Sequence, residues 1–389
     1  MSAIFQNYAR YPLTFVKGEG ARLTDENGRV FLDFGCGISV VNLGHSHPHV
    51  TKTIQAQAAT LIHTSNLYRN PLQEQLADRL SRCGFGGDVF FCNSGAEANE
   101  AALKLARIYS NKKYDGKRSR VLTLQNSFHG RTYMTLSATG QEKVKKGFEP
   151  IMECFTHIRG GDFCSFLNEV KKGDVGAVIL EIVQGEGGLE MLPRDYLVEV
   201  SEYCAKYDIL LILDEIQTGF GRTGDIFAYK HYGITPDIMT LAKGIANGVP
   251  MGAVMAKHEV AEYLSAGTHG STFGGNYLAC AAAHAVLDVM TEKDFMLQVR
   301  EKGDYFLGKL AEIFHQTEVT VHGTALMSGV KVPGKQKEFI ENCMNNGLIV
   351  IPAGNDVVRI YPPLTVTYEE LDEGLALIRK SASEMGIGD

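Results

Sequence analysis

Through the middle of the chain, short and mainly apolar runs alternate with segments of helical spacing. The helical segments include 194–207 and 95–109, in which Leu105 and several alanines share one face. The apolar runs lie at 88–92, 120–124, 176–183, 209–213, 237–241 and 252–256. Runs without polar alternation are typical of strands that helices cover on both faces. The pattern therefore predicts an α/β fold, with a mainly parallel central sheet and helices on both of its faces.

The two ends of the chain follow a different pattern, which divides the sequence into three parts. We expect an N-terminal segment over 1–48, with a hairpin turn at Asn27-Gly28, that packs against a smaller domain. A large ligand-binding domain is expected over 49–280, and the smaller domain, of α+β type, over 281–389.

The charge balance excludes some classes of partner. The chain has 38 basic and 45 acidic residues, a net charge of −7, whereas nucleic-acid and membrane-surface proteins carry a basic face. Its eight cysteines include no CxxC pair, so we expect reduced thiols in a cytoplasmic protein and no metal site. We also expect no targeting signal and no membrane span. Small molecules are the expected partners.

Two motifs suggest other chemistry. GFGRTG at 219–224 matches the glycine pattern of a dinucleotide site, but DEIQT separates it from the preceding strand and no acid follows at the required distance. His45, His47 and His49 could face one metal ion in an extended chain, but Pro48 breaks that geometry. We interpret the histidines as hydrogen-bonded members of a turn.

Four segments at predicted strand ends have residue types suited to a phosphorylated, electron-poor aromatic aldehyde. Ligands bind at such strand ends in parallel sheets. In the first segment, Gly95 lets an anion approach the start of a helix, where N–H groups and the helix dipole favour a phosphate. Ser94 and Glu97 are expected to form a capping box there, as are Thr367 and Glu370 at the C-terminal helix.

The other three segments carry an acid, a lysine, and an aromatic residue with an arginine. Asp214 ends an apolar run, where a buried acid needs a cationic partner such as a protonated pyridine nitrogen. Lys243 follows another run, and a desolvated lysine is nucleophilic toward an aldehyde. Phe128 could stack on a flat ring, and Arg131 could bind a carboxylate. Taken separately, a structural ion pair and a surface lysine are alternatives, but four such segments together favour one ligand site.

The chain resembles, over nearly its full length, the class-III pyridoxal-phosphate aminotransferases of fold type I. The motifs that carry the resemblance are GEGARLTDENGRVFLDFGCGISVVNLGHSHP, NSGAEANEAALKLAR, SFHGRT, QGEGG, LDEIQTGFGRTG, AKGIANGVPMGA and HGSTFGGN. The histidine turn and GFGRTG belong to these motifs, so the metal and dinucleotide alternatives lose their support. The resemblance implies pyridoxal 5′-phosphate as the cofactor and no metal.

The resemblance also implies a role for each matching residue. Lys243 would bind the cofactor's aldehyde carbon, and Asp214 would pair with the ring N–H, so both would be catalytic. Gln217 would reach the ring's phenolic oxygen, and Phe128 would cover one face of the ring.

The phosphate of the cofactor would be bound from two chains. Gly95 and Ala96 match residues that donate backbone N–H groups to it. Ser271 and Thr272 match a loop that reaches the neighbouring subunit's site, with Thr272 contacting the phosphate there. The resemblance therefore implies a homodimer with shared active sites.

The substrate residues suggest a donor and an acceptor. Arg131 matches an arginine that holds a substrate carboxylate, and Glu186 and Arg359 match a pair that gates a second carboxylate position. Such a gate would let one site take an ω-amine and 2-oxoglutarate in turn. Ile38 stands where ornithine-using relatives have a tyrosine that binds the free α-amine, which favours N2-acetyl-L-ornithine as the amino donor.

The expected products are N-acetyl-L-glutamate 5-semialdehyde and L-glutamate, a step of arginine biosynthesis. N-succinyl-diaminopimelate, succinylornithine, GABA and ornithine are alternative donors. An aminomutase of the same fold is a further alternative, and it would need no 2-oxoglutarate.

Overall fold

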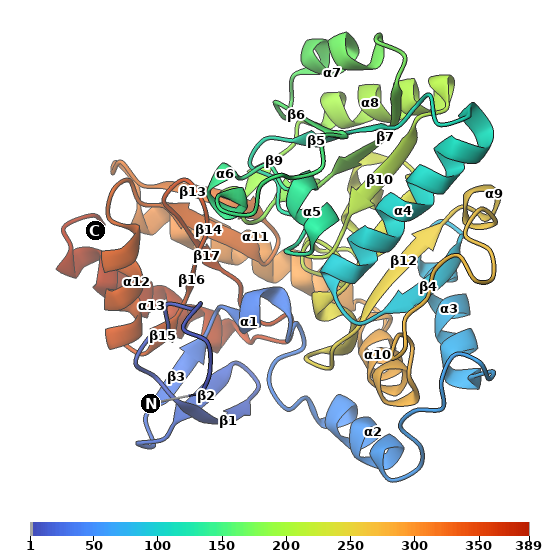
Figure 1. Cartoon of the computed structure of the whole chain (residues 1–389). Helices are drawn as coiled ribbons and strands as arrows, with labels where there is room; N and C mark the ends of the chain where they lie inside the picture. Colours follow the sequence, from blue (N-terminus) through green and yellow to red (C-terminus); the bar gives the residue numbers. More distant parts are fainter. Residues whose placement is uncertain (1–2, 389) are drawn as a thin grey trace.

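The computed structural model describes residues 3–388, and this part of the chain contains a seven-stranded central sheet (Figure 1). The strand order is β4-β12-β11-β10-β7-β5-β6, and every strand except β12 runs in the same direction. The bounds are β4 Asp88–Cys92, β5 Arg120–Leu124, β6 Phe155–Ile158, β7 Val175–Leu180, β10 Leu210–Asp214, β11 Ile238–Leu241 and β12 Gly252–Ala256. The predicted fold class, a mainly parallel sheet, is confirmed.

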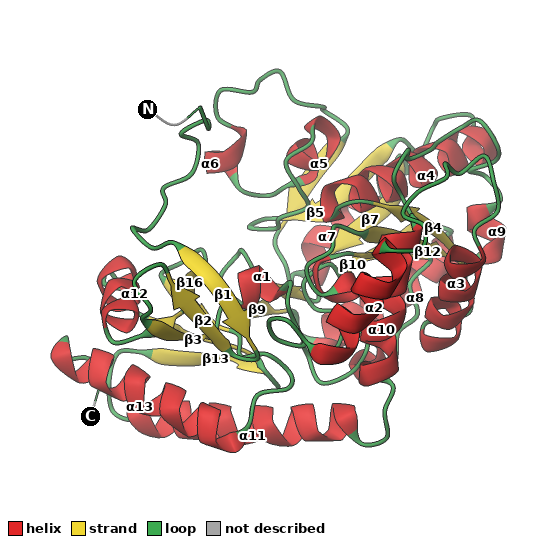
Figure 2. Ribbon diagram, turned by 90° about the horizontal axis from the view of Figure 1, so that it is seen from below, coloured by secondary structure: helices red, strands yellow, loops and turns green. Residues whose placement is uncertain are grey.

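Helices cover both faces of this sheet. The strands lie between α4 (Gly95–Tyr114), which packs on β11 and β12, and α8 (Arg194–Tyr207), which packs on β10 (Figure 2). The other elements of this part are α2 Pro48–Ala58, α3 Pro71–Cys83, α5 Tyr133–Ala138, α6 Glu142–Lys145, α7 Phe163–Val170, α9 His258–Ala261, α10 Tyr277–Met290, and the 3₁₀ turns η1 Ala228–Tyr232 and η2 Lys243–Ala246. None of the helices in the described residues is long and apolar enough to cross a membrane.

The C-terminal part forms a smaller antiparallel sheet in the order β13-β14-β17-β16. Its elements are β13 Thr320–Thr324, β14 Met327–Lys331, β16 Ile351–Pro352, β17 Val357–Ile360, α11 Phe295–Ile313, α12 Gln336–Asn345 and α13 Tyr368–Glu384. The capping box predicted for α13 is confirmed. Thr367 Oγ1 accepts from Glu370 N–H at 3.2 Å, and the Glu370 carboxylate accepts from Thr367 N–H at 3.0 Å.

The N-terminal segment joins the C-terminal part through one sheet, β1-β2-β3-β15. The strands are β1 Phe15–Glu19, β2 Arg22–Asp25, β3 Val30–Asp33 and β15 Leu348–Ile349. The predicted turn at Asn27-Gly28 connects β2 and β3, and β3 pairs in parallel with β15. This pairing favours the expected three-part division, which stays a prediction. The proposed limit at residue 280 falls inside α10, which packs on α2 and α3, so Met290 is the better boundary.

One predicted strand is interrupted. The run at 176–183 does not form a single strand, because β7 ends at Leu180 and the chain leaves the sheet at Glu181. The Glu181 carboxylate accepts a hydrogen bond from Phe128 N–H at 2.9 Å. The chain then forms β8 (Val183–Gln184), which pairs with β9 (Glu190–Met191).

The capping box predicted at α4 is only half formed. Ser94 Oγ accepts from Glu97 N–H at 3.2 Å, as expected. The Glu97 carboxylate, however, accepts from Asn93 N–H at 2.7 Å and from Asn93 Nδ2 at 2.8 Å, not from Ser94. The Glu97 carboxylate binds Asn93 in place of the Ser94 N–H group, because Asn93 offers two donors to one carboxylate oxygen.

The GFGRTG segment contains Arg222, whose side chain is fully buried and forms hydrogen bonds with distant segments of the chain. In the N-terminal segment, the guanidinium donates to Ser39 Oγ at 3.1 Å and to Asn42 Oδ1 at 2.7 Å. In the C-terminal part, it donates to the carbonyl oxygens of Leu326 and Pro362 at 3.1 and 2.6 Å. Arg222 therefore holds three parts of the chain together.

The histidines of the HSHPH segment bind different partners. His45 Nε2 lies 2.7 Å from Asp33 Oδ2, and His49 Nε2 lies 2.9 Å from Asp288 Oδ2. These contacts match the predicted turn with hydrogen-bonded histidines. His47 is the exception, because its buried Nδ1 has no hydrogen-bond partner within residues 3–388.

Candidate active site

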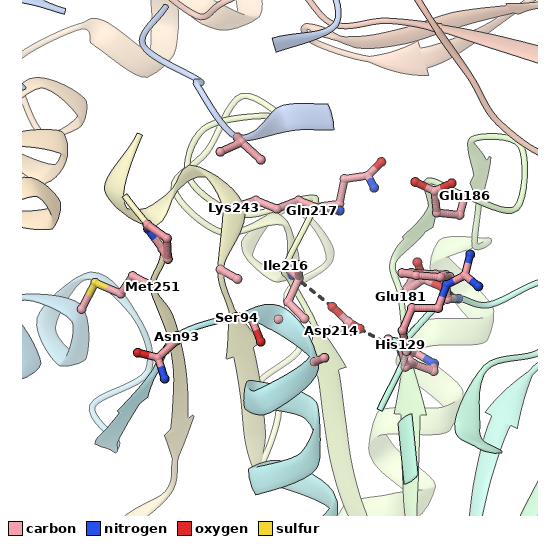
Figure 3. Close-up of a pocket in the computed structure, with 18 of the residues that line it drawn as sticks. Asn93, Ser94, His129, Glu181, Glu186, Asp214, Ile216, Gln217, Lys243 and Met251 are labelled. Atoms are coloured by element: carbon pink, nitrogen blue, oxygen red, sulfur yellow. Dashed lines mark hydrogen bonds and ion pairs between the residues drawn. The ribbon is translucent and has the colours of Figure 1, made fainter. Parts of the chain in front are cut away.

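A cavity of about 430 Å³ opens where the carboxyl ends of the parallel strands meet (Figure 3). Its wall is built by segments that follow β4, β5, β7, β10 and β11. The predicted site residues that line it are Gly95, Ala96, Phe128, Arg131, Glu186, Asp214, Gln217 and Lys243. Segments far apart in the sequence thus meet where the sheet topology places a ligand.

Asp214 is the last residue of β10, and three hydrogen bonds hold its buried carboxylate. Oδ2 accepts from Asn99 Nδ2 and from His129 Nδ1, both at 2.8 Å, and Oδ1 accepts from Ile216 N–H at 3.1 Å. A carboxylate that is ionised can only accept hydrogen bonds, and His129 is then the donor through Nδ1. The three donors stabilise the charged form of Asp214 and fix the direction of its oxygens.

Glu181 lies beside Asp214 at the end of the neighbouring strand. Leu180 pairs with Leu213 in the parallel β7–β10 register, and the next residue of each strand lines the cavity. Burial raises the pKa of Glu181 well above its usual range, and the negative charge of Asp214 raises it further. Because Asp214 has three donors and Glu181 accepts only from Phe128 N–H within the described residues, we assign the charge to Asp214 and the proton to Glu181.

Lys243 begins η2 in a left-handed backbone conformation, with φ of 45°. A non-glycine residue in this region costs about 1–3 kcal/mol, and such residues cluster at functional sites. Burial lowers the pKa of Lys243, which raises the fraction of neutral amine. A neutral lysine amine is the form that attacks an aldehyde.

The start of α4 forms another wall of the cavity. The first N–H groups of a helix have no partner within the helix. Ser94 accepts that of Glu97, and the N–H groups of Gly95 and Ala96 stay available for an anion. A Cβ at Gly95 would lie 2.9 Å from Ile216 Cδ1, so glycine lets the helix start pack closely on the segment after β10.

Two further polar side chains line the cavity, Gln217 from the segment after β10 and Arg131 from the segment after β5. Gln217 Oε1 accepts a hydrogen bond from Tyr361 Oη at 2.9 Å. Arg131 is exposed, and its guanidinium carbon lies 5.7 Å from the centre of the Phe128 ring. The guanidinium can therefore bind a carboxylate that enters the cavity.

The two residues that were predicted to form a gate, Glu186 and Arg359, are joined by an ion pair. Arg359 Nη1 lies 2.5 Å from Glu186 Oε1, and Arg359 Nη2 donates to the carbonyl of Pro352 at 2.6 Å. Arg359 is buried, whereas Glu186 is partly exposed and lines the cavity. In this arrangement Arg359 is masked, and Arg131 is the exposed guanidinium of the cavity wall.

Ser271 and Thr272 do not line this cavity. They lie in a separate hollow of about 380 Å³, which shares Asn93 with the cavity. Ser271 Oγ accepts from Asn93 Nδ2 at 3.0 Å. The two residues therefore border the site of their own chain without facing into it.

Ile38 also stands outside the cavity wall, in the turn α1 (Cys36–Ser39). Cys36, Ile38 and Ser39 are left-handed, with φ of 47°, 66° and 60°. Ile38 is 40% exposed, and Val40 is the residue of this segment that lines the cavity. Left-handed backbone is costly for a β-branched residue, and Ser39 is held in place by its bond to Arg222.

Sequence reasoning missed four residues of the site: Asn99, His129, Glu181 and Tyr361. Three of them could have been noticed in the sequence, because each is a polar residue on an apolar helix face, in a motif or within an apolar run. Asn99 lies on the buried face of α4, His129 lies within SFHGRT, and Glu181 interrupts the run GAVILEIV. Tyr361 gave no such signal, since its phenol contacts a residue from another part of the chain.

The polar groups of the cavity match one kind of ligand. Among the described residues, two acids of the cavity wall, Asp214 and Glu186, contact His129 and Arg359, and neither forms an ion pair with Lys243. An acid suited to a ring N–H, an amine suited to an aldehyde, and helix N–H groups suited to a phosphate surround one space. This set of groups fits pyridoxal 5′-phosphate.

The comparisons with known proteins agree with this fit. The family model Aminotransferase class-III matches residues 4–381, and the chain belongs to that family. The chain is 49% identical over 381 residues to the acetylornithine aminotransferase of Bacillus cereus, which covers 97% of both chains. An N-acetylornithine aminotransferase structure from Stenotrophomonas maltophilia matches with a TM-score of 0.85 at 33% identity, over 97% of both chains.

A structure of the ornithine aminotransferase from Toxoplasma gondii, with partial occupancy of PLP at its active site, also matches. Its TM-score is 0.93 at 34% identity, over 99% of this chain and 93% of that chain. The protein is a pyridoxal-phosphate-dependent aminotransferase of fold type I.

The substitution Glu181→Gln tests the assignment of the proton. In the folded protein Glu181 keeps its proton at pH values where it would be ionised in the unfolded chain. Its contribution to stability is therefore full below the unfolded pKa and is lost as the pH rises toward the raised folded pKa. We expect the Tm of Glu181→Gln minus that of the wild type to be near zero at pH values below the unfolded pKa of Glu181 and to increase as the pH rises above it.

The measurement is thermal unfolding of both proteins at a series of pH values, with Glu169→Gln as the matched control. Hydrogen bonds from Lys172 and Arg120 lower the pKa of Glu169, so its stabilisation is present above the unfolded pKa. At pH values above the unfolded pKa, Glu169→Gln should therefore have a lower Tm than the wild type. This difference has the opposite sign to the one expected for Glu181→Gln. A difference at Glu181 that does not change with pH would contradict the assignment.

Proposed function

We propose that this enzyme transfers the δ-amino group of N2-acetyl-L-ornithine to 2-oxoglutarate, giving N-acetyl-L-glutamate 5-semialdehyde and L-glutamate in arginine biosynthesis. The observation that carries the proposal is one cavity lined by Lys243, Asp214 and the exposed Arg131, whose wall also contains Glu186, the residue that pairs with and masks Arg359. The 49% identity to the acetylornithine aminotransferase of Bacillus cereus favours the acylated donor.

Lys243 and Asp214 are the catalytic residues of the proposal. Lys243 would hold the aldehyde carbon of pyridoxal phosphate, and its amine, whose pKa is lowered by burial, would accept and return the substrate proton. Asp214 keeps the ring nitrogen protonated, because its charged form is fixed by three donors. Bound pyridoxal phosphate supplies the electron sink for the substrate's negative charge.

The remaining cofactor contacts come from three walls of the cavity. The N–H groups of Gly95 and Ala96 bind the phosphate at the start of α4. Phe128 covers one face of the ring. Gln217 lines the cavity after β10 and would donate to the ring's phenolic oxygen.

In the proposed reaction, Arg131 and Arg359 bind different carboxylates of the substrates. While Glu186 masks Arg359, an ω-amine enters with an uncharged carbon beside its nitrogen, and Arg131 binds its distant carboxylate. 2-Oxoglutarate has a carboxylate beside its reacting carbon. When Glu186 moves away, Arg359 binds that carboxylate and Arg131 binds the other one.

The choice of donor rests on two apolar side chains, Ile38 in α1 and Val40 directly after it. An acylated α-nitrogen is uncharged and loses little next to apolar side chains, whereas a free ammonium needs a hydrogen-bond partner. Ile38 and Val40 offer none from their side chains, and Val40 lines the cavity. N2-acetyl-L-ornithine therefore fits this segment better than ornithine does.

A panel of amino donors with 2-oxoglutarate tests the proposal. The kcat/KM for N2-acetyl-L-ornithine should exceed that for ornithine by about 10-fold or more, the discrimination expected of a site that lacks a partner for one polar group. The panel also contains N-succinyl-diaminopimelate, succinylornithine and GABA, and the readout is the glutamate formed.

Lys243→Ala is the control, and it should fold but form no glutamate from any donor, because the cofactor attachment and the base are lost together. A preference for ornithine or GABA would contradict the proposed donor. Turnover without 2-oxoglutarate would contradict an aminotransferase reaction and favour the aminomutase.

We also propose a homodimer with shared active sites, in which Thr272 contacts the phosphate bound by the neighbouring subunit. The surface next to Thr272 is rich in exposed apolar side chains, which is typical of protein interfaces. These side chains are Leu61, Ile62, Leu67 and Phe273, with exposures of 39%, 50%, 87% and 61%. Asn66 Nδ2 donates to the carbonyl of Ser271 at 2.9 Å and so joins the two loops. Eight free cysteines support a cytoplasmic location for this dimer.

Mixing two inactive homodimers tests the shared site. After mild dissociation and reassociation of Lys243→Ala with Thr272→Val at limiting cofactor, activity should rise above the average of the two parents. The reason is that one site of each heterodimer regains both native residues. Activity that stays at the average would show that Thr272 acts within its own chain.

A further inference from the structure

Tyr361 is a buried phenol next to the active site that the proposed reaction does not use. It directly follows β17 and is fully buried. Its hydroxyl donates to Gln217 Oε1 at 2.9 Å, and Gln217 lines the cavity from the segment after β10. The bond therefore joins the C-terminal part of the chain to a cofactor residue of the large domain.

The bond decides which end of the Gln217 carboxamide faces the cavity. A carboxamide has an oxygen that accepts and an NH₂ group that donates. With the oxygen bonded to Tyr361, the NH₂ group is the end that remains for a ligand oxygen. Burial raises the pKa of Tyr361, so the phenol keeps the proton that it donates.

The surroundings leave Gln217 little freedom to turn. A Cβ at Gly185 would lie 1.9 Å from Gln217 Oε1, so the backbone of the segment after β8 closes one side of the carboxamide. Gln217 is only 7% exposed. The Tyr361 ring itself contacts two arginines, with the guanidinium carbons of Arg222 and Arg359 at 5.4 and 6.0 Å from its centre.

We propose that Tyr361 is a positioning residue of the aminotransferase site, whose hydroxyl orients Gln217 so that its NH₂ group donates to the phenolic oxygen of pyridoxal phosphate. This inference rests on the proposed role of Gln217 and is independent of the amino donor. Arg359 precedes Tyr361 by two residues, so the carboxylate gate and the support of Gln217 belong to one segment.

The substitution Tyr361→Phe tests the proposal, because it removes the hydroxyl and keeps the ring. We expect the dissociation constant of pyridoxal phosphate, measured by equilibrium dialysis of the full-length protein, to rise about 2- to 10-fold, the effect of one neutral hydrogen bond. The visible absorption of the bound cofactor should also change its pH dependence, since the ring oxygen loses a fixed donor.

Tyr196→Phe is the matched control, because Tyr196 Oη is buried and has no hydrogen-bond partner within residues 3–388. This variant also loses one buried hydroxyl, and it should bind pyridoxal phosphate as the wild type does, with an unchanged spectrum.

A double-mutant cycle with Gln217→Ala separates positioning from a merely structural effect. If Tyr361 acts through Gln217, Tyr361→Phe should weaken cofactor binding in the wild-type background and have no further effect in Gln217→Ala. An equal loss in both backgrounds, or wild-type binding and spectrum in Tyr361→Phe, would overturn the proposal. These measurements use no amino donor, so a wrong donor would leave their outcome unchanged.

Discussion

The buried carboxylate of Asp214 is the interaction on which the rest of the active site depends. A buried charge at the carboxyl end of β10 is stable only where hydrogen-bond donors surround it. Asn99 from α4, His129 from the segment after β5, and the N–H of Ile216 supply them. The carboxylate thus forms hydrogen bonds with three segments of the chain. Its charge is also one reason why the pKa of Glu181 is raised and Glu181 retains a proton. In the proposed function, a protonated ring nitrogen would be the cationic partner of this carboxylate.

The parts of the chain outside the central sheet hold the edges of this site. Arg222 joins the left-handed turn before Val40 to the carbonyls of Leu326 and Pro362. Tyr361 holds Gln217 from the C-terminal side. Tyr361, from the C-terminal part of the chain, thus restricts a side chain at the end of β10, and the masked Arg359 lies in the same segment as Tyr361.

The sheet and two of its end residues could be predicted from the sequence for a physical reason. Uninterrupted apolar runs require cover on both faces, and Asp214 and Lys243 stand directly at the ends of such runs. Glu186 and Arg359 lie 173 positions apart, so no local pattern links them, and only the family resemblance suggested the pair. The roles of Glu181 and Tyr361 depend on strand register and on packing between distant segments, which a single sequence does not reveal.

Replacing Asp214 with Asn tests the role of this carboxylate most directly. The amide keeps the size of the side chain but carries no charge to hold a proton on the ring nitrogen. With pyridoxal phosphate still bound through Lys243 and the start of α4, kcat should fall by about 100-fold or more, as expected when a charge-stabilising group is lost. A kcat near that of the wild type, with the cofactor bound, would show that another group holds the ring nitrogen and would contradict the central place given to Asp214.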